Sequence, residues 1–274
     1  MNSTQYRIGP IKINFPDQNQ GYFSVFEDLA ELFGREYQSD AVKSLRAKLK
    51  DIKPKASIDY EADFTHITTT NVDTLISIIN AIVELSKSQH EDYSEIDQLA
   101  LREIFQQAKK NRPKPFEWKT GDVFAIPLAD KTFSFGQVLD KRYCTCVLFN
   151  YKSDNPKISN LYFIELIPLS ILHLSNGDLL NNGQWTIIFN EQVKLDPSIG
   201  YGGRAGTIGS ISHGRCKAMV DLANAYWGLQ PWNVMFEENY YDKLLLSGIN
   251  IPNTAIILSQ DERTKYRREK FGIK

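Results

Sequence analysis

The residues of this chain that could do chemistry are few, and their spacing fits no familiar catalytic motif. The four histidines, His66, His90, His173 and His213, form neither an H-x-x-x-H nor an H-E-x-x-H pair, so the motif of a zinc hydrolase is missing. The segment 209–213 (GSISH) lacks the G-x-S-x-G form of a nucleophile elbow. We therefore expect no catalytic residue, no metal ligand set and no cofactor.

A glycine-rich segment, Gly200–Gly209, at first suggests a phosphate-binding loop. A P-loop needs a lysine and then Ser or Thr directly after its last glycine, so that backbone N–H groups and the lysine converge on phosphate. No lysine stands there, and the preceding residues lack the strand of a dinucleotide-binding βαβ unit. We interpret the segment as a closely packed loop or a mobile lid, while Arg204 and His213 leave a small anion site open as an alternative.

The cysteines, Cys144, Cys146 and Cys216, favour a structural role. An odd number with one C-x-C pair is not a disulfide framework. Alternate residues of a strand point to the same face, so Cys144 and Cys146 are expected to share one side of a strand. A role as small buried apolar residues is favoured over a metal or redox role, which would need C-x-x-C spacing and more ligands.

Three acidic residues, Asp59, Glu61 and Asp63, alternate with apolar ones along segment 56–70. This pattern predicts a half-buried strand with an acidic exposed face. A solvated sheet edge is the ordinary interpretation. The functional alternative is a surface for an electropositive protein partner, because complementary charge speeds association and selects partners.

Composition excludes several classes of function. The 274 residues carry a formal net charge of -1, with 42% hydrophobic and 24% charged residues, which is normal for a soluble globular protein. Nucleic-acid binding would need a concentrated basic face. No apolar run approaches the roughly 20 residues of a membrane span, and residues 1–15 have no apolar core of a secretory signal. We expect a cytoplasmic protein without a nucleic-acid or membrane partner.

The elements that position these residues change character near the middle of the chain. Residues 1–112 are predicted to form a helix-rich α+β domain, with strands over 11–15 and 56–70 and helices over 22–37, 40–49, 72–88 and 94–111. Arg112-Pro113-Lys114-Pro115 then favours an extended linker, since the prolines cannot continue a helix. The domain boundary is expected there.

Residues 113–274 are predicted to form a second domain that begins as an antiparallel β-barrel-like structure and ends in a helical C-terminal extension. Alternating apolar residues predict strands over Val123–Pro127, Phe133–Leu139, Tyr143–Tyr151, Leu161–Pro168 and Trp185–Asn190. A helical pattern returns at 215–227, and the charged tail from Asp261 predicts an exposed helix. The fold class is therefore α+β.

Two neighbouring strands of this second domain resemble a known family. Residues 119–128 (KTGDVFAIPL) and 135–139 (FGQVL) are similar to the immunity protein 26 family of bacterial polymorphic-toxin systems. The family's core would cover roughly 115–190, and the continuation to 274 resembles its longer members, whereas residues 1–112 fall outside the resemblance. It implies a cytosolic immunity protein that binds and neutralises a cognate toxin in interbacterial competition.

The same broader group also carries the label of a HocA-type phosphotriesterase, so a metal-dependent hydrolase is the alternative. That alternative predicts a bound divalent metal and a need for His173 or His213. For the immunity protein, the candidate toxin-binding residues are Asp59, Glu61, Asp63, Trp118, Asp122, Tyr151 and Arg204. Aromatic residues and arginine are included because interface hot spots favour them.

Overall fold

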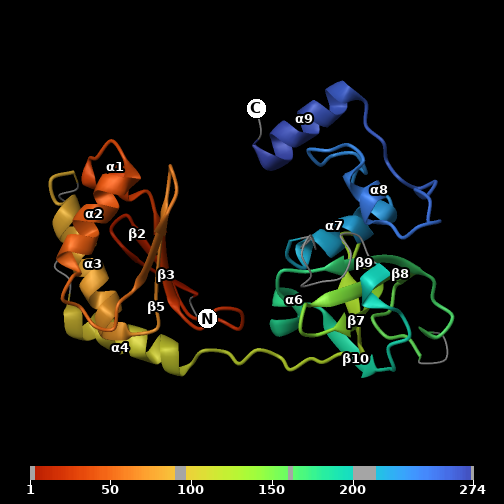
Figure 1. Cartoon of the computed structure of the whole chain (residues 1–274), viewed down its shortest axis with the longest axis horizontal. Coiled ribbons are helices and arrows are strands. Elements are labelled where there is room, and N and C mark those ends of the chain that lie inside the picture. Colours follow the sequence, from red (N-terminus) through yellow and green to blue (C-terminus); the bar gives the residue numbers. More distant parts are fainter. Residues whose placement is uncertain (1–3, 90–96, 160–162, 200–213, 273–274) are drawn as a thin grey trace. The chain divides into compact units, whose positions relative to one another are not determined.

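The structure, a computed structural model, describes residues 4–89, 97–159, 163–199 and 214–272. The chain divides into two compact units, residues 1–114 and 115–274 (Figure 1). The division falls within the proline-containing segment 112–115. The architecture is mixed α+β with two antiparallel sheets, as the sequence predicts.

Unit 1 packs helices against one face of an antiparallel sheet with the strand order β1-β2-β3-β5-β4 (Figure 1). Its strands are β1 (Gln5–Ile8), β2 (Ile11–Asn14), β3 (Phe23–Glu27), β4 (Ser57–Tyr60) and β5 (Thr65–Thr69). Its helices are α1 (Leu29–Phe33), α2 (Gln38–Lys48), α3 (Val72–Ser86) and α4 (Gln98–Lys110). Alternate strand residues such as Ile13, Val25 and Ile67 are buried in the same core as Ile79 and Ile82 of α3.

At the start of two helices of this unit, a side chain accepts hydrogen bonds from backbone N–H groups of the first turn. The Asn71 side chain accepts a hydrogen bond from the Thr74 backbone N–H at 2.9 Å and begins α3. Asp97 accepts from the backbone N–H groups of Leu99 and Ala100 and begins α4. Each bond satisfies a donor that the first helical turn leaves unpaired.

The predicted helix over residues 22–37 is wrong at both ends, because only residues 29–33 of it are helical. Residues 23–27 form strand β3, and α1 begins only after Asp28, whose side chain caps it by accepting from the Glu31 backbone N–H at 2.9 Å. In β3 the side chains of Phe23 and Val25 are buried, whereas Phe26 is exposed. The segment is a strand, in which alternate side chains face the core, although its apolar residues also have helical spacing. The reason is that β3 pairs with the strands β2 and β5 on its two sides.

The predicted single strand over residues 56–70 is also wrong, since it folds as a hairpin. Strands β4 and β5 pair antiparallel, and the turn between them is closed by a backbone hydrogen bond from Glu61 N–H to the Phe64 carbonyl at 2.9 Å. Asp59 lies on the edge strand β4, while Glu61 and Asp63 lie in the turn, so the acidic residues sit around a hairpin end.

Unit 2 is built on a second antiparallel sheet with the strand order β10-β6-β7-β8-β9. Its strands are β6 (Asp122–Pro127), β7 (Phe133–Asp140), β8 (Thr145–Ser153), β9 (Pro168–His173) and β10 (Thr186–Asn190). Among the described residues no pairing joins β9 to β10, so a closed barrel is not shown. The strand predicted over 161–168 is wrong, because β9 begins only at Pro168. Residues 163–165 form a turn before it, and residues 161 and 162 lie outside the described part.

The two faces of the second sheet have separate cores. One contains Cys146 and Leu148 of β8 and is covered by the C-terminal extension, in which α7 (Lys217–Tyr226) and α8 (Tyr240–Leu244) contribute buried residues. The other contains Val147 and Phe149 of the same strand.

The last helix, α9 (Gln260–Phe271), is attached to this extension by a buried cation. The Arg263 guanidinium, 6% exposed, donates to the backbone carbonyls of Asn233, Met235 and Phe236 and to the Glu238 carboxylate. The remainder of α9 is largely exposed, as its charged sequence predicts. No helix in the described residues is both long and apolar enough to cross a bilayer.

Candidate binding surface

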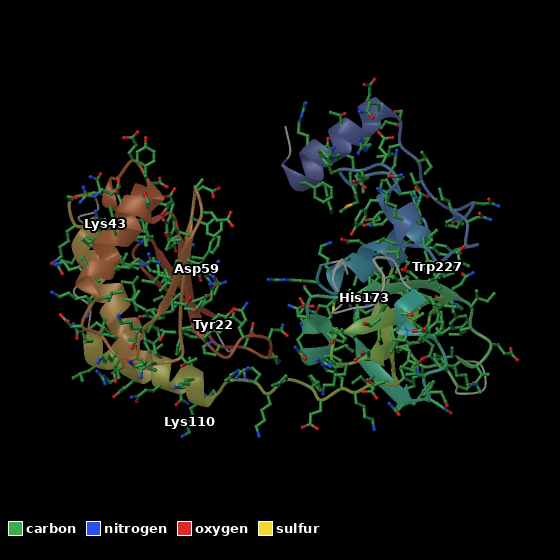
Figure 2. The ribbon with its side chains drawn as sticks, viewed as in Figure 1. Tyr22, Lys43, Asp59, Lys110, His173 and Trp227 are labelled. Atoms are coloured by element: carbon green, nitrogen blue, oxygen red, sulfur yellow. The ribbon has the colours of Figure 1, made fainter. Side chains whose placement is uncertain are left out.

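The first candidate surface lies at the β4–β5 hairpin of unit 1. We define the acidic–aromatic patch as Phe26, Asp59, Glu61, Asp63, Phe64 and His66. The three carboxylates are exposed, and the Phe26 side chain is 51% exposed. Figure 2 shows Lys43 on the helical side of this unit and Asp59 on the opposite side of the sheet. An exposed aromatic residue can serve as an anchor for a protein partner, and the charges around it select that partner.

Strand pairing brings the members of this patch together from three strands. Phe26 of β3 pairs with His66 of β5, and His66 pairs with Asp59 of β4, which forms one cross-strand row. The Phe26 ring also stacks on the Phe64 ring, with centroids 4.4 Å apart, and lies 5.9 Å from the His66 ring. These contacts hold the exposed ring in place, so less side-chain entropy is lost when a partner covers it.

Trp118 and Tyr151, the candidate aromatic anchors of unit 2, lie on opposite faces of its sheet. Trp118 is half-buried against the core that the C-terminal extension covers, and its indole N–H donates to Asn181 Oδ1 at 2.8 Å. Tyr151 packs on Phe135 in the core of the other face, with ring centroids 5.4 Å apart. One partner surface of unit 2 therefore does not present both rings.

Asp122 is a correction to the predicted set. Its side chain is buried, and its two carboxylate oxygens accept hydrogen bonds from the Lys119 backbone N–H at 2.7 Å and from Asn190 Nδ2 at 2.8 Å. These bonds fasten the turn before β6 to β10. A carboxylate so engaged is not available to a partner, so Asp122 is a structural residue of the K-T-G-D turn. Arg204 and the Gly200–Gly209 segment lie outside the described residues.

The histidines of the hydrolase alternative are not gathered into a metal site in the part of the chain that the structure describes. His173 is 3% exposed, and its Nδ1 lies 3.0 Å from the Thr145 hydroxyl. His66 belongs to the other unit, and His90 and His213 lie outside the described residues. Within those residues, no group of three or more His, Cys, Asp or Glu side chains is arranged to hold a metal ion.

The three cysteines are buried, as predicted, but Cys144 and Cys146 do not lie on the same strand. Cys144 lies in the turn before β8 at φ 46, and only Cys146 is in the strand. Both are buried with Cys216 in the same apolar core. Hydrogen bonding to Cys146 and burial raise the pKa of the Cys144 thiol, and hydrogen bonding to Cys144 and burial raise that of Cys216. Such thiols remain protonated and unreactive, so the thiols serve the packing.

Sequence reasoning missed Phe26 and Phe64 as surface residues. Phe26 falls within the helix predicted over 22–37 and Phe64 within the single strand predicted over 56–70, and neither prediction brings the two rings together at the surface. The alternation of Phe23, Ser24 and Val25, with the capping residue Asp28 shortly after, could have indicated a strand that places Phe26 on the same face as Ser24. The pairing of Phe26 with Phe64 depends on strand order and has no signal in the sequence.

Comparison with known proteins supports the resemblance of the second unit. The family model of immunity protein 26 matches residues 119–200, which span the sheet from β6 to β10. No curated protein and no solved structure matches the chain. The matched residues include both motif strands, and unit 1 lies wholly outside the match.

Proposed function

We propose that this protein is a cytoplasmic immunity protein that binds and neutralises a cognate bacterial toxin. The observation that carries the proposal is the match of residues 119–200 to immunity protein 26. The mechanism is stoichiometric binding that covers the active site of the toxin or clamps one of its mobile elements. This mechanism needs no catalytic group of this chain. The structural roles of Asp122 and of the cysteines are consistent with it.

We assign the main toxin contact to the acidic–aromatic patch of unit 1. Asp59, Glu61 and Asp63 provide the charge that would attract a basic toxin, and long-range attraction accelerates encounter. Phe26 provides a ring that a partner can desolvate, which is the usual source of affinity at an interface. In this arrangement the family-matched unit 2 contributes a second surface through Trp118 or Tyr151.

A stable complex needs more than the patch itself. Specific interfaces bury about 1,600 Å² in total, or about 800 Å² on each partner. The exposed face of the β3–β5–β4 sheet continues from the patch along the strands, so a partner seated on Phe26 can extend across it. The helices α1 to α4 lie on the other face and leave this one accessible within unit 1 (Figure 1).

The direct test uses the toxin domain encoded next to the gene of this chain. Co-expression of the full chain should restore growth of cells that produce the toxin domain, and the purified proteins should form a 1:1 complex by light scattering. Restored growth with no physical complex would contradict neutralisation by binding. Turnover of the toxin or of its product by catalytic amounts of the chain would favour the hydrolase alternative instead.

A further inference from the structure

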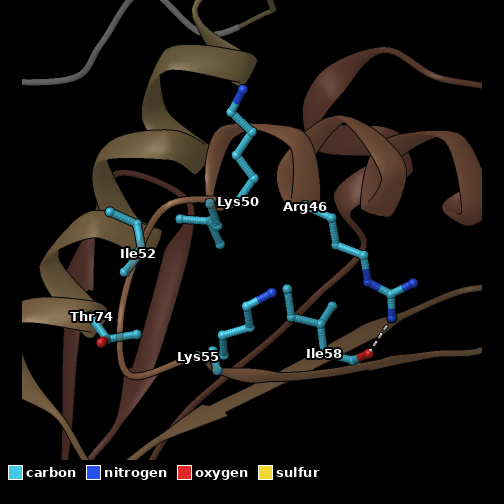
Figure 3. A pocket seen from close by; sticks show the side chains of 8 residues that line it. Arg46, Lys50, Ile52, Lys55, Ile58 and Thr74 are labelled. Atoms are coloured by element: carbon cyan, nitrogen blue, oxygen red, sulfur yellow. Dashed lines mark hydrogen bonds between the residues drawn. The ribbon is translucent and has the colours of Figure 1, made fainter.

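We propose that unit 1 contains a binding site for a small amphipathic anion, a molecule with an apolar body and a carboxylate or sulfonate headgroup. The site is the pocket between the C-terminal end of α2, the 49–56 segment and strand β4 (Figure 3). It lies on the helical side of the sheet edge, whereas the acidic–aromatic patch faces the opposite side. The inference therefore goes beyond the proposed toxin binding and does not rest on it.

The body of the pocket is apolar. It has a volume of about 290 Å³, close to the lower end of the roughly 300–1,000 Å³ typical of small-molecule sites. The apolar lining residues are Leu49, Ile52, Ala56 and Ile58, and three of them also pack against the core of unit 1. Because these residues belong to a packed core, the apolar walls are held in place before a ligand arrives.

The charged residues that line the pocket are all cationic: Arg46, Lys50 and Lys55. Figure 3 shows the Lys55 ammonium directed toward the cavity and the Lys50 ammonium directed away from it. The Arg46 guanidinium donates to the Ile58 carbonyl at 2.8 Å, which orients it at the rim. The segment 46–55 (RAKLKDIKPK) adds Lys48 and Lys53 and contains one carboxylate, Asp51.

The apolar walls of the pocket and the cationic residues at its rim together determine which class of ligand can bind. Apolar walls favour a hydrocarbon or aromatic body, since burying it removes apolar surface from water. Lys55 and Arg46 favour a negative headgroup at the mouth and disfavour a cationic one, because a second cation there would meet like charge. A neutral analogue would gain the apolar contact alone.

The test measures displacement of the fluorescent probe 8-anilinonaphthalene-1-sulfonate from the full-length protein. Decanoate should displace the bound probe, and decylammonium, with the same chain and the opposite charge, should displace it at least about tenfold less effectively. Equal displacement by the two compounds, or none by decanoate, would overturn the proposal.

Two variants locate the site and one serves as a matched control. Lys55→Glu reverses the charge at the mouth and should weaken decanoate binding roughly fivefold to tenfold. Ala56→Phe fills the cavity and should abolish the binding. Lys110→Glu makes the same charge change at an exposed position at the end of α4 (Figure 2), a helix that contributes no residue to the pocket lining, and should bind as the wild type does. Far-UV circular dichroism establishes that each variant is folded. Wild-type binding by both pocket variants, or an equal loss in Lys110→Glu, would refute the assignment.

Discussion

The residues of the family motif are explained by backbone geometry. Gly136 lies in the middle of β7, where an added Cβ would come within 2.6 Å of Phe124 Cζ and of the Val147 carbonyl oxygen. Phe124 in turn stacks on Trp185, with centroids 4.7 Å apart. Gly121 has φ +91, and a Cβ there would lie 2.6 Å from the Glu191 carbonyl oxygen. Both glycines of the motif are thus needed for close packing.

Replacing Gly136 by alanine should destabilise unit 2. The methyl group would push the Phe124 ring out of its stack with Trp185, and overpacking of this kind costs about 1–3 kcal/mol. Chemical denaturation followed by tryptophan fluorescence measures the change. Gln184→Ala, at an exposed position of the same unit, is the control and should leave the tryptophan transition unchanged. An unchanged denaturation midpoint for Gly136→Ala would contradict this explanation.

Asp130 makes the β6–β7 turn sensitive to acid. Its carboxylate accepts from Lys152 Nζ at 2.7 Å and from the Thr132 hydroxyl and backbone N–H at 2.6 and 3.1 Å. The Lys152 ammonium, and then Thr132, lower the pKa of Asp130 to about 2. Because the pKa is lower in the folded protein, the charged carboxylate stabilises the fold above the unfolded pKa of about 3.9. That contribution is lost as the pH falls toward 2.

Asp130→Asn should therefore lower the melting temperature slightly at neutral pH, and the difference from wild type should shrink between pH 4 and pH 2. Asparagine retains a side-chain oxygen that can accept from Thr132, so the variant isolates the effect of charge. Melting curves across this range measure it. Asp154→Asn, a neutralisation at an exposed position after β8, is the control. A difference that persists undiminished at pH 2 would show that charge is not the cause.

At the scale of elements, the β4–β5 hairpin converts an acidic sequence pattern into a surface. A single strand would have placed the carboxylates along one edge, whereas the turn at 61–64 gathers them around Phe64 and beside Phe26. Arg46 of α2 also bonds to the Ile58 carbonyl of β4. The edge strand is therefore attached to the helical layer as well as to β5.

The hairpin variants test the proposed toxin contact. Phe26→Ala should weaken toxin binding by about 2 kcal/mol or more, the usual threshold for an interface hot spot. Asp59→Lys should mainly slow association at low salt, because charge steers encounter. Leu99→Ala and Glu103→Lys are matched controls on exposed positions of α4. Surface plasmon resonance at two salt concentrations separates the effects.

If the two hairpin variants bind the toxin as tightly and as quickly as their controls, the acidic–aromatic patch is not the contact. Loss of binding in Tyr151→Ala would then place the contact on the family-matched unit. Retained folding, measured by circular dichroism, is required of every variant in this comparison.

At the scale of the whole molecule, the chain offers separate probes for its two units. All four tryptophans, Trp118, Trp185, Trp227 and Trp232, lie in unit 2. The core of unit 1 is instead rich in phenylalanine: Phe105 is fully buried and contacts the rings of Tyr6, Phe15 and Phe23 edge to face. Tryptophan fluorescence therefore reports on unit 2, whereas circular dichroism reports on both.

We predict that the units unfold independently. Phe105→Ala should destabilise unit 1 by about 3–5 kcal/mol, as is usual for removal of a buried phenylalanine. It should shift one transition seen by circular dichroism and leave the tryptophan transition unchanged. Leu99→Ala, on the same helix but 74% exposed, should shift neither. A tryptophan transition that moves with Phe105→Ala would show that the units unfold as one.

The sequence alone was sufficient for the features that depend on short-range chemistry. Asn71 marks the start of α3 because a side-chain acceptor is needed beside the first free N–H groups. Alternation along 123–127 and 133–139 indicates strands because successive side chains point to opposite faces. The resemblance of this segment to immunity protein 26 likewise rests on contiguous residues, and the family match confirms it.

Only the tertiary structure decided which of these side chains face outward and which lie together. The sequence predicted a helix over 22–37, which includes Phe26, and a partner-binding role for Asp122, because spacing along the chain does not reveal strand partners. The strand order leaves the Phe26 ring exposed beside the acidic hairpin. It also buries the Asp122 carboxylate against Asn190. Exposure depends on contacts between distant segments, and these form only when the sheets assemble.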